Sequence, residues 1–281
     1  MQVGVEGRVE PEDDVVDRDP QVESAFSIEV DDLIWAHIRE RRAAGSTKED
    51  ILAQMLKAAS AVHPDNPITD AEIRDEASTL FVAGHDTTSA ALAWFWYCMT
   101  QHPEVERRAM AEVDYVVGSR PATAADFGQL RFLEMVVKES MRLYPVAGFL
   151  FGREAIEDVE LGGHMLRRGS WVMIAPYVVH RDARNFPDPE NFDPDRFSPA
   201  RADDIPSYAY IPFGGGPRTC IGNAVATMQI VLMAATVLQR FRVSLEQGPP
   251  EIELEIVLRP KGGLRAKVAP RDAGERLPLA G

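Results

Sequence analysis

The sequence predicts a mainly helical α+β protein with small β-sheets. Helical apolar patterns fill most of the first half of the chain, and another covers about Asn223 to Arg240. Between them, after Tyr144-Pro145, short β-like runs alternate with Gly and Pro. With 45% hydrophobic and 26% charged residues in 281, the composition is that of a globular protein. No repeat is visible, so one domain over residues 26–270 is expected.

Helices dominate the front of the chain. Apolar spacing predicts helices at Phe26–Arg42 and Lys48–Ala59. The capping box "TDAE" at Thr69 begins a third helix that continues to about Thr100, and Pro103 ends it. At about 45 Å this helix is longer than most in globular proteins. Its stretch "AALAWFWYCM" is apolar nearly all round, which predicts a path through the core.

The remaining elements are shorter. Two further helices are predicted at Glu104–Val117 and Leu130–Leu143. Seven prolines in residues 181–218 indicate a long ordered loop or a meander. The β-like runs are Val159–Leu161, Ser170–Ile174, Arg242–Leu245 and Ile252–Leu258.

The chain ends and the charge limit the possible partners. Residues 1–25 carry eight acids against two arginines and predict a flexible acidic lead-in, while 271–281 predict a frayed tail. The net charge of −14 argues against nucleic acid or anionic lipid as a partner. Without a membrane segment or signal peptide, the chain is expected in the cytoplasm; an anchor in a longer parent would lie outside this sequence. The two cysteines, Cys98 and Cys220, fit a reducing compartment.

The segment "FGGGPRTCIG", residues 213–222, presents Cys220 after three glycines and Arg218. A buried structural thiol is the commoner role of a lone cysteine. Here Gly214, Gly215 and Gly216 indicate unusual backbone angles or a close approach of the backbone to another group. Arg218 and the helix predicted to follow both favour a thiolate. The surroundings therefore favour a nucleophile or a metal ligand.

Several cysteine and loop chemistries can be compared with these residues. A phosphate-binding loop would need a lysine, and a phosphatase loop would need an arginine after the cysteine. A zinc site would need further Cys or His ligands nearby. The segment has none of these residues. A cysteine hydrolase with a distant histidine stays open, as does the axial ligand of a haem iron. "HRDARN" at His180–Asn185 resembles a kinase catalytic loop but has Pro187 where that loop needs asparagine.

Four motifs together resemble the cytochrome P450 (haem-thiolate monooxygenase) family. The cysteine segment matches the family signature F-x-x-G-x-R-x-C-x-G at every fixed position. "AGHDTT" at Ala83–Thr88, "ESMR" at Glu139–Arg142 and "FDPDRF" at Phe192–Phe197 precede it in the family's order. The resemblance is close from about Ile68 onward, but the family's W-x-x-x-R helix has no match. It implies a cytochrome P450 fold truncated at the N-terminus, with a long central helix over the haem and a Cys-ligand loop.

On the cysteine side, the resemblance implies haem b bound through Cys220 as the iron ligand. Arg218 and Arg153 would face the haem propionates. The other cofactor-binding residues implied are Phe213, Gly214 and Gly222. Glu139, Arg142 and Arg196 would form an ion-pair lock that holds the loop and takes no part in catalysis.

On the central helix, the resemblance implies catalytic roles for Asp86 and Thr87 as an acid–alcohol pair that delivers protons. Gly84 would leave room for dioxygen beside the haem. His85 is expected to pack or to lie on the surface. Phe149 and Phe151 fit a substrate pocket and a packing role equally well.

The implied activity is insertion of one oxygen atom from O2 into a small apolar organic substrate, with electrons from a reductase or a ferredoxin. A peroxide-using relative or an isomerase is disfavoured by Asp86 and Thr87, because such enzymes have less need of a proton relay. An incomplete, non-catalytic fragment with weak or no haem binding is the alternative from a different class.

Overall fold

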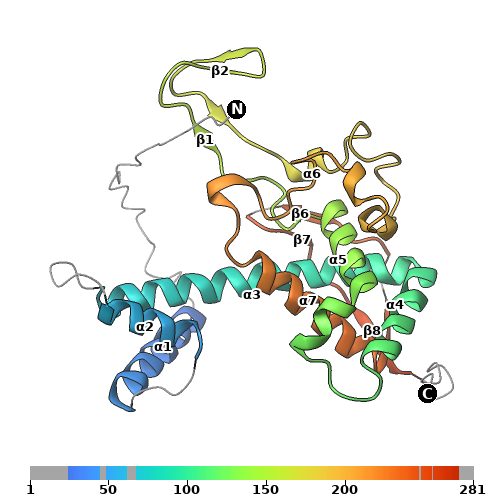
Figure 1. Ribbon diagram of the computed structural model, residues 1–281, viewed down its shortest axis with the longest axis horizontal. Helices are drawn as coiled ribbons and strands as arrows, with labels where there is room; N and C mark the ends of the chain where they lie inside the picture. Colours follow the sequence, from blue (N-terminus) through green and yellow to red (C-terminus); the bar gives the residue numbers. More distant parts are fainter. Residues whose placement is uncertain (1–24, 45–48, 62–67, 247, 255, 272–281) are drawn as a thin grey trace. The chain divides into compact units, whose positions relative to one another are not determined.

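A computed structural model describes residues 25–44, 49–61, 68–246, 248–254 and 256–271. The protein is mainly helical with small antiparallel sheets, as predicted (Figure 1). It divides into two compact units, residues 1–85 and 86–281, and the boundary falls within helix α3 (Asp70–Gln101). Most of the predicted acidic lead-in and frayed tail, 1–24 and 272–281, lies outside the described residues.

The first unit contains α1 (Ala25–Ala44), α2 (Ile51–Ala61) and the start of α3, all three predicted. The capping box is confirmed, because the Thr69 N–H donates to Glu72 Oε2 at 2.7 Å and the Glu72 N–H donates to Thr69 Oγ1 at 3.2 Å. A small buried apolar cluster joins the three helices: Ile38, Leu56, Ala59 and Ile73.

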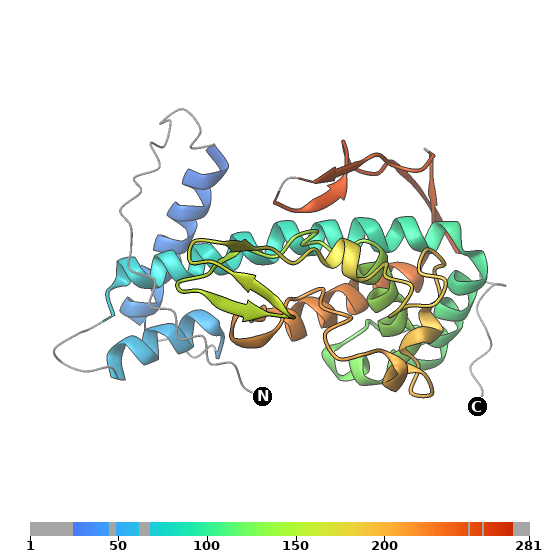
Figure 2. The same cartoon turned by 90° about the horizontal axis from the view of Figure 1, so that it is seen from above.

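The second unit packs the rest of α3 with α4 (Pro103–Val116), α5 (Arg131–Leu143) and α7 (Asn223–Leu238) around the main core (Figures 1 and 2). The predicted path of α3 through the core is confirmed in this half, where Trp94 and Phe95 are each 1% exposed. Trp94 stacks on Tyr144 at 4.1 Å and donates its indole N–H to the Leu258 carbonyl at 2.9 Å. This bond anchors the C-terminal strands to α3.

Helix α5 is fixed at its start by a side chain from α4. The carboxylate of Glu112 accepts the N–H groups of Phe132 at 2.7 Å and Leu133 at 2.8 Å. These N–H groups belong to the first turn, which has no partner within the helix. Burial raises the pKa of Glu112. The helix that carries "ESMR" is therefore held in a defined position.

Within the described residues, four two-stranded antiparallel sheets complete the fold. The pairs are β1 (Arg153–Glu154) with β4 (Trp171–Val172), β2 (Val159–Leu161) with β3 (His164–Leu166), β5 (Phe241–Leu245) with β8 (Ala266–Pro270), and β6 (Ile252–Leu254) with β7 (Leu258–Pro260). The single strand predicted at Ile252–Leu258 is wrong. Leu254 pairs with Leu258, so the run is a tight hairpin, and no Gly or Pro marks its turn in the sequence.

The predicted long loop over residues 181–218 is confirmed. After the short helix α6 (Pro176–Val179), it contains only the 3-10 turns η2 (Pro194–Phe197), η3 (Ala202–Asp204) and η4 (Gly216–Arg218). The loop leads from the end of α6 to the cysteine segment at the start of α7.

Candidate functional site

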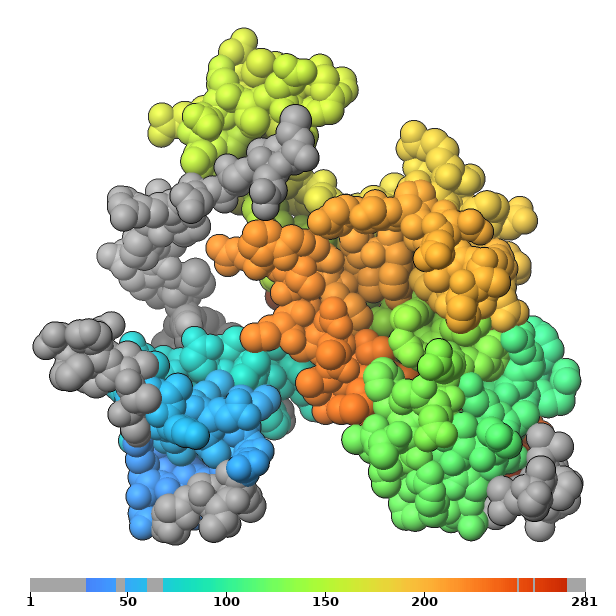
Figure 3. Space-filling model, in the orientation of Figure 1, coloured from blue at the N-terminus to red at the C-terminus, as the bar shows by residue number. Residues whose placement is uncertain are grey.

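The cysteine segment forms a tight loop that closes on itself. The Gly214 N–H donates to the Ile211 carbonyl at 3.0 Å, and the Cys220 N–H donates to the Phe213 carbonyl at 2.9 Å. Cys220 is exposed, whereas Cys98 is buried, and burial raises the pKa of Cys98 to about 12. The loop and the start of α7 belong to the orange surface that faces the viewer in Figure 3. Only Cys220 is thus accessible to a ligand from outside the chain.

The glycines of this loop are needed for two different reasons. Gly214 at φ +75° and Gly216 at φ +71° adopt the left-handed conformation that side chains disfavour. At Gly215, a Cβ atom would lie 2.9 Å from the Tyr208 ring. Gly222 caps α7 at φ −83°, where a Cβ would lie 3.8 Å from the Cys220 sulfur. The predicted unusual backbone angles are confirmed for Gly214 and Gly216, and the predicted close approach is confirmed for Gly215.

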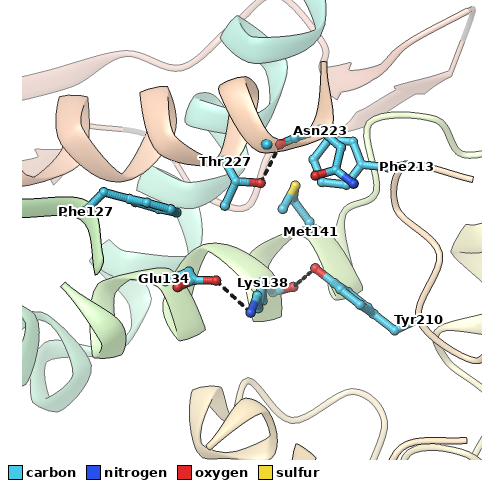
Figure 4. A pocket seen from close by; sticks show the side chains of 9 residues that line it. Phe127, Glu134, Lys138, Met141, Tyr210, Phe213, Asn223 and Thr227 are labelled. Carbon is cyan, nitrogen blue, oxygen red and sulfur yellow. Dashed lines mark hydrogen bonds and ion pairs between the residues drawn. The ribbon is translucent and has the colours of Figure 1, made fainter. Parts of the chain in front are cut away.

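Phe213 packs its ring against the main core and lines an open pocket of about 320 Å³ behind the loop (Figure 4). Helix α5 contributes Glu134 and Lys138, which pair at 2.7 Å. The Tyr210 hydroxyl donates to the Lys138 carbonyl at 3.0 Å. The loop is therefore joined to α5 through the residues that precede the cysteine.

The predicted ion-pair lock is confirmed at the end of α5. Arg142 donates from Nε and Nη2 to the two carboxylate oxygens of Glu139 at 2.7 and 2.8 Å, and both side chains are 0% exposed. Arg196 of η2 lies 3.4 Å from the same carboxylate. Arg142 also donates to the carbonyls of His180, Pro189 and Asn191. One buried guanidinium thus fixes the chain around residues 180–191.

His180 also belongs to this assembly, and its place there was not predicted from the sequence. Its ring is 0% exposed, with Nδ1 at 3.2 Å from the Arg142 carbonyl oxygen and Nε2 at 2.9 Å from the Ile211 nitrogen. Both partners are backbone groups more than 30 residues away, so no sequence spacing could have indicated them.

The two predicted propionate ligands lie on different segments. Arg218 is exposed at the end of η4, and none of the described residues pairs with its guanidinium. Arg153 pairs with Val172 in the β1–β4 ladder and donates to the carbonyls of Phe151 and Gly152, each at 3.0 Å. The segment that carries Arg153 approaches the loop, because Leu150 lies 3.9 Å from the position of a Cβ on Gly214.

The residues predicted on the central helix have separate surroundings. The Asp86 side chain is 54% exposed, and its carboxylate lies 4.0 Å from the Arg259 guanidinium of β7. Thr87 is half-buried. Gly84 belongs to the first unit, and a Cβ there would meet nothing within 4 Å. His85 is exposed, as expected, with its ring 6.3 Å from Phe81. The catalytic role of Asp86 and Thr87 stays a prediction.

The family model described as "Cytochrome P450" matches residues 21–267. The chain belongs to the cytochrome P450 family. The family is one of haem-thiolate monooxygenases.

Curated cytochromes P450 from distant organisms are similar to this chain. "Cytochrome P450 4V2" of Homo sapiens is 41% identical over 215 residues, which cover 75% of this chain and 41% of the relative. "Putative cytochrome P450 132" of Mycobacterium tuberculosis (strain CDC 1551 / Oshkosh) is 39% identical over 240 residues, which cover 85% and 50%. "Cytochrome P450 4c3" of Drosophila melanogaster is 38% identical over 210 residues, which cover 73% and 39%. The chain thus spans half or less of the length of these relatives. Within its described part, no helix has both the length and the apolar composition needed to cross a bilayer.

The surroundings of Cys220 fit a haem. A haem-thiolate cytochrome P450 needs one cysteine ligand, and Cys220 is exposed at the head of α7. Large apolar side chains stay exposed beside it, with Ile221 at 91% and Val225 at 49%. An apolar macrocycle would cover such side chains, and the exposed guanidinium of Arg218 suits a propionate carboxylate.

Proposed function

We propose that this chain carries the haem-thiolate site of a cytochrome P450 monooxygenase, with a catalytic domain over residues 26–270. The observation that carries the proposal is the exposed thiol of Cys220 on a loop fixed to the buried Glu139–Arg142 pair. When bound, haem b would supply the activation of O2 for inserting one oxygen atom into a small apolar organic substrate.

On the cysteine side, the chain's own residues bind and orient the cofactor. Cys220 would provide the thiolate, and Gly214 lets the backbone of the loop turn at a positive φ. Phe213 holds the loop against the core, and Gly222 keeps the space beside the sulfur small. Arg218 and Arg153 bind the propionates as charge-assisted donors. The exposure of Arg218 and the closeness of Leu150 to Gly214 support these two assignments.

On the central helix, Asp86 and Thr87 hold and move protons. A carboxylate that is 54% exposed exchanges protons with water, and the Thr87 hydroxyl follows it directly in the helix. The Arg259 guanidinium lies 4.0 Å from this carboxylate. Gly84 leaves space at the helix surface, because a Cβ there has no neighbour within 4 Å.

The apolar nature of the substrate is inferred from the segment beside the loop. Phe149 is 48% exposed and Phe151 86% exposed, and Leu150 between them approaches Gly214. Exposed aromatic side chains next to the cofactor site suit an apolar ligand. The electrons would come from a reductase or a ferredoxin.

The test is to load the full chain with haem, reduce it and add carbon monoxide. A strongly red-shifted Soret band is expected, and Cys220→Ser should abolish it while Cys98→Ser, the matched control, leaves it in place. An unshifted band in the parent chain, or an unchanged band in the Cys220→Ser variant, would refute the assignment of the ligand.

A chain that takes up no haem would instead support the incomplete, non-catalytic fragment. For the proton relay, Thr87→Ala should lower the yield of product per electron consumed in active enzyme. Unchanged coupling would reject that role.

A further inference from the structure

His180 connects the buried ion-pair lock to the cysteine loop. The Ile211 N–H can only donate, so Nε2 of His180 must accept its hydrogen bond at 2.9 Å. Nδ1 then carries the proton and donates it to the Arg142 carbonyl at 3.2 Å. The two backbone groups therefore select one neutral tautomer of the ring.

The two partners of His180 lie at decisive positions. The carbonyl of Arg142 is in the last turn of α5, where carbonyls have no partner within the helix. Ile211 is the residue whose carbonyl accepts the Gly214 N–H and so begins the loop. The loop is closed two residues later, where the Phe213 carbonyl accepts the Cys220 N–H. A continuous path of hydrogen bonds and short backbone steps leads from Arg142 to Cys220.

The ring is held in place on its faces as well as at its nitrogens. Tyr210 stacks on it at 5.4 Å, and Phe186 meets it edge-on at 6.4 Å. The charged groups that act on it are the guanidiniums of Arg142 and Arg181. Burial, aided by these cations, lowers the pKa of His180 to about 4, so the ring stays neutral near pH 7. Nε2 thus remains a hydrogen-bond acceptor under those conditions.

We propose that His180 is the positioning residue for Cys220: by accepting the Ile211 N–H it sets the place of the cysteine loop against α5. This inference rests on the proposed function of Cys220 as the iron ligand. Its role differs from that of the loop glycines, which give the loop its shape. His180 is 0% exposed and acts through the backbone of Ile211.

Two variants separate its two hydrogen bonds. His180→Gln retains an acceptor at the reach of Nε2, and His180→Asn retains a donor at the reach of Nδ1 but leaves the Ile211 N–H without an acceptor. Gln239→Ala serves as a control, because Gln239 is a buried side chain that bridges two other carbonyls, of Gly118 and Arg120, away from the loop. It should lower stability without altering the loop.

The first measurement is amide hydrogen exchange on the full chain without haem. His180→Asn should speed exchange at Ile211 and Cys220 by at least about tenfold relative to core amides of α5, as expected for the loss of one buried hydrogen bond. His180→Gln and Gln239→Ala should preserve the protection at these two amides. If the Asn variant fails to fold, protection of Ile211 in the Gln variant decides: retention supports the proposal and loss overturns it. Equal exchange in the Asn and Gln variants would also overturn it.

The second measurement is the carbon monoxide spectrum of the haem-loaded chain. His180→Asn should convert a larger share of the red-shifted band into the unshifted band than His180→Gln or Gln239→Ala does. A parental spectrum in the Asn variant would reject His180 as a positioning residue. If the parent chain binds no haem, the proposed function fails, while the exchange data still decide whether His180 sets the loop.

Discussion

Replacing Arg142 by methionine should destabilise the protein far more than an ordinary loss of a surface charge. The guanidinium makes five hydrogen bonds: two to Glu139 and one each to the carbonyls of His180, Pro189 and Asn191. Methionine has a similar length and fills much of the space, but it donates none of these bonds. The variant therefore tests the polar contacts more than the packing.

The magnitude follows from what the substitution leaves behind. Removing one partner of a buried ion pair costs about 3–5 kcal/mol, because the other charge stays buried with less compensation. Among the described residues, Glu139 then retains only Arg196, at 3.4 Å, and the Asp193 N–H, at 2.9 Å. We expect a loss of about 4 kcal/mol, which lowers the urea midpoint by about 2 M for an m-value of about 2 kcal/mol/M.

The pH dependence of this loss has a defined sign. Burial raises the pKa of Glu139, while Arg142 opposes the rise. Without Arg142 the pKa rises further above its unfolded value, so the folded variant binds a proton that the unfolded chain does not. The variant therefore regains stability as the pH falls from the pKa of Glu139 in the folded variant toward its value in the unfolded chain. The destabilisation should be greatest at neutral pH.

Urea unfolding followed by far-UV circular dichroism measures the effect, with Lys138→Met as the matched control. Lys138 lies on the same helix and pairs with Glu134 at 2.7 Å, but its side chain is 36% exposed. The control should lose less than about 1 kcal/mol. Equal losses in the two variants, or a loss for Arg142→Met that grows on acidification, would refute the reasoning.

Three further predictions concern other groups. Acidification from pH 7 to pH 4 should lower the free energy of unfolding by up to about 3 kcal/mol through His180. Its pKa of about 4 in the folded chain lies below the unfolded value of 6.5, so the unfolded chain takes up the proton first. In urea unfolding, the stability of His180→Gln should therefore depend less steeply on pH. Gly84→Ala should stabilise helix α3 by about 1 kcal/mol, whereas Gly214→Ala, at a positive φ, should destabilise the protein by about 1–2 kcal/mol. Midpoints of thermal unfolding that shift in the same direction in both variants would contradict the conformational argument. Iodoacetamide should label Cys220 but not Cys98 in native buffer, and modification of Cys98 detected by mass spectrometry would show that its burial is wrong.

The long helices could be predicted to within a few residues, because their signals are local and repeated. For α3, the capping box fixed the start and Pro103 the end, and the structure gives Asp70–Gln101. Short strands lack such signals. β2 was predicted with its observed bounds, Val159–Leu161, but β1, β3 and β8 were missed. Strands of two or three residues are too short to show a period, and their pairing depends on distant segments.

The candidate site divides in the same way. The backbone angle of Gly214 could be predicted because the run of glycines in one loop indicates it, while the role of Cys220 stays a prediction. Glu139 and Arg142 could be paired because they are three residues apart on one helix face. His180 could not, because it binds the backbone of Arg142 and Ile211, 38 and 31 residues away, and backbone groups leave no trace in the sequence.

The cysteine signature specifies the shape of its loop but not the position of that loop in the fold. Gly214 and Gly216 determine the shape of the loop, but they do not determine its position relative to α5. That position is set by two hydrogen bonds. The Tyr210 hydroxyl donates to the Lys138 carbonyl, and the Ile211 N–H donates to the ring of His180. A cysteine ligand must be placed to within a fraction of an ångström to bind a metal well. The proposed thiolate site therefore has two requirements: the signature, and the buried polar contacts that hold its loop against α5.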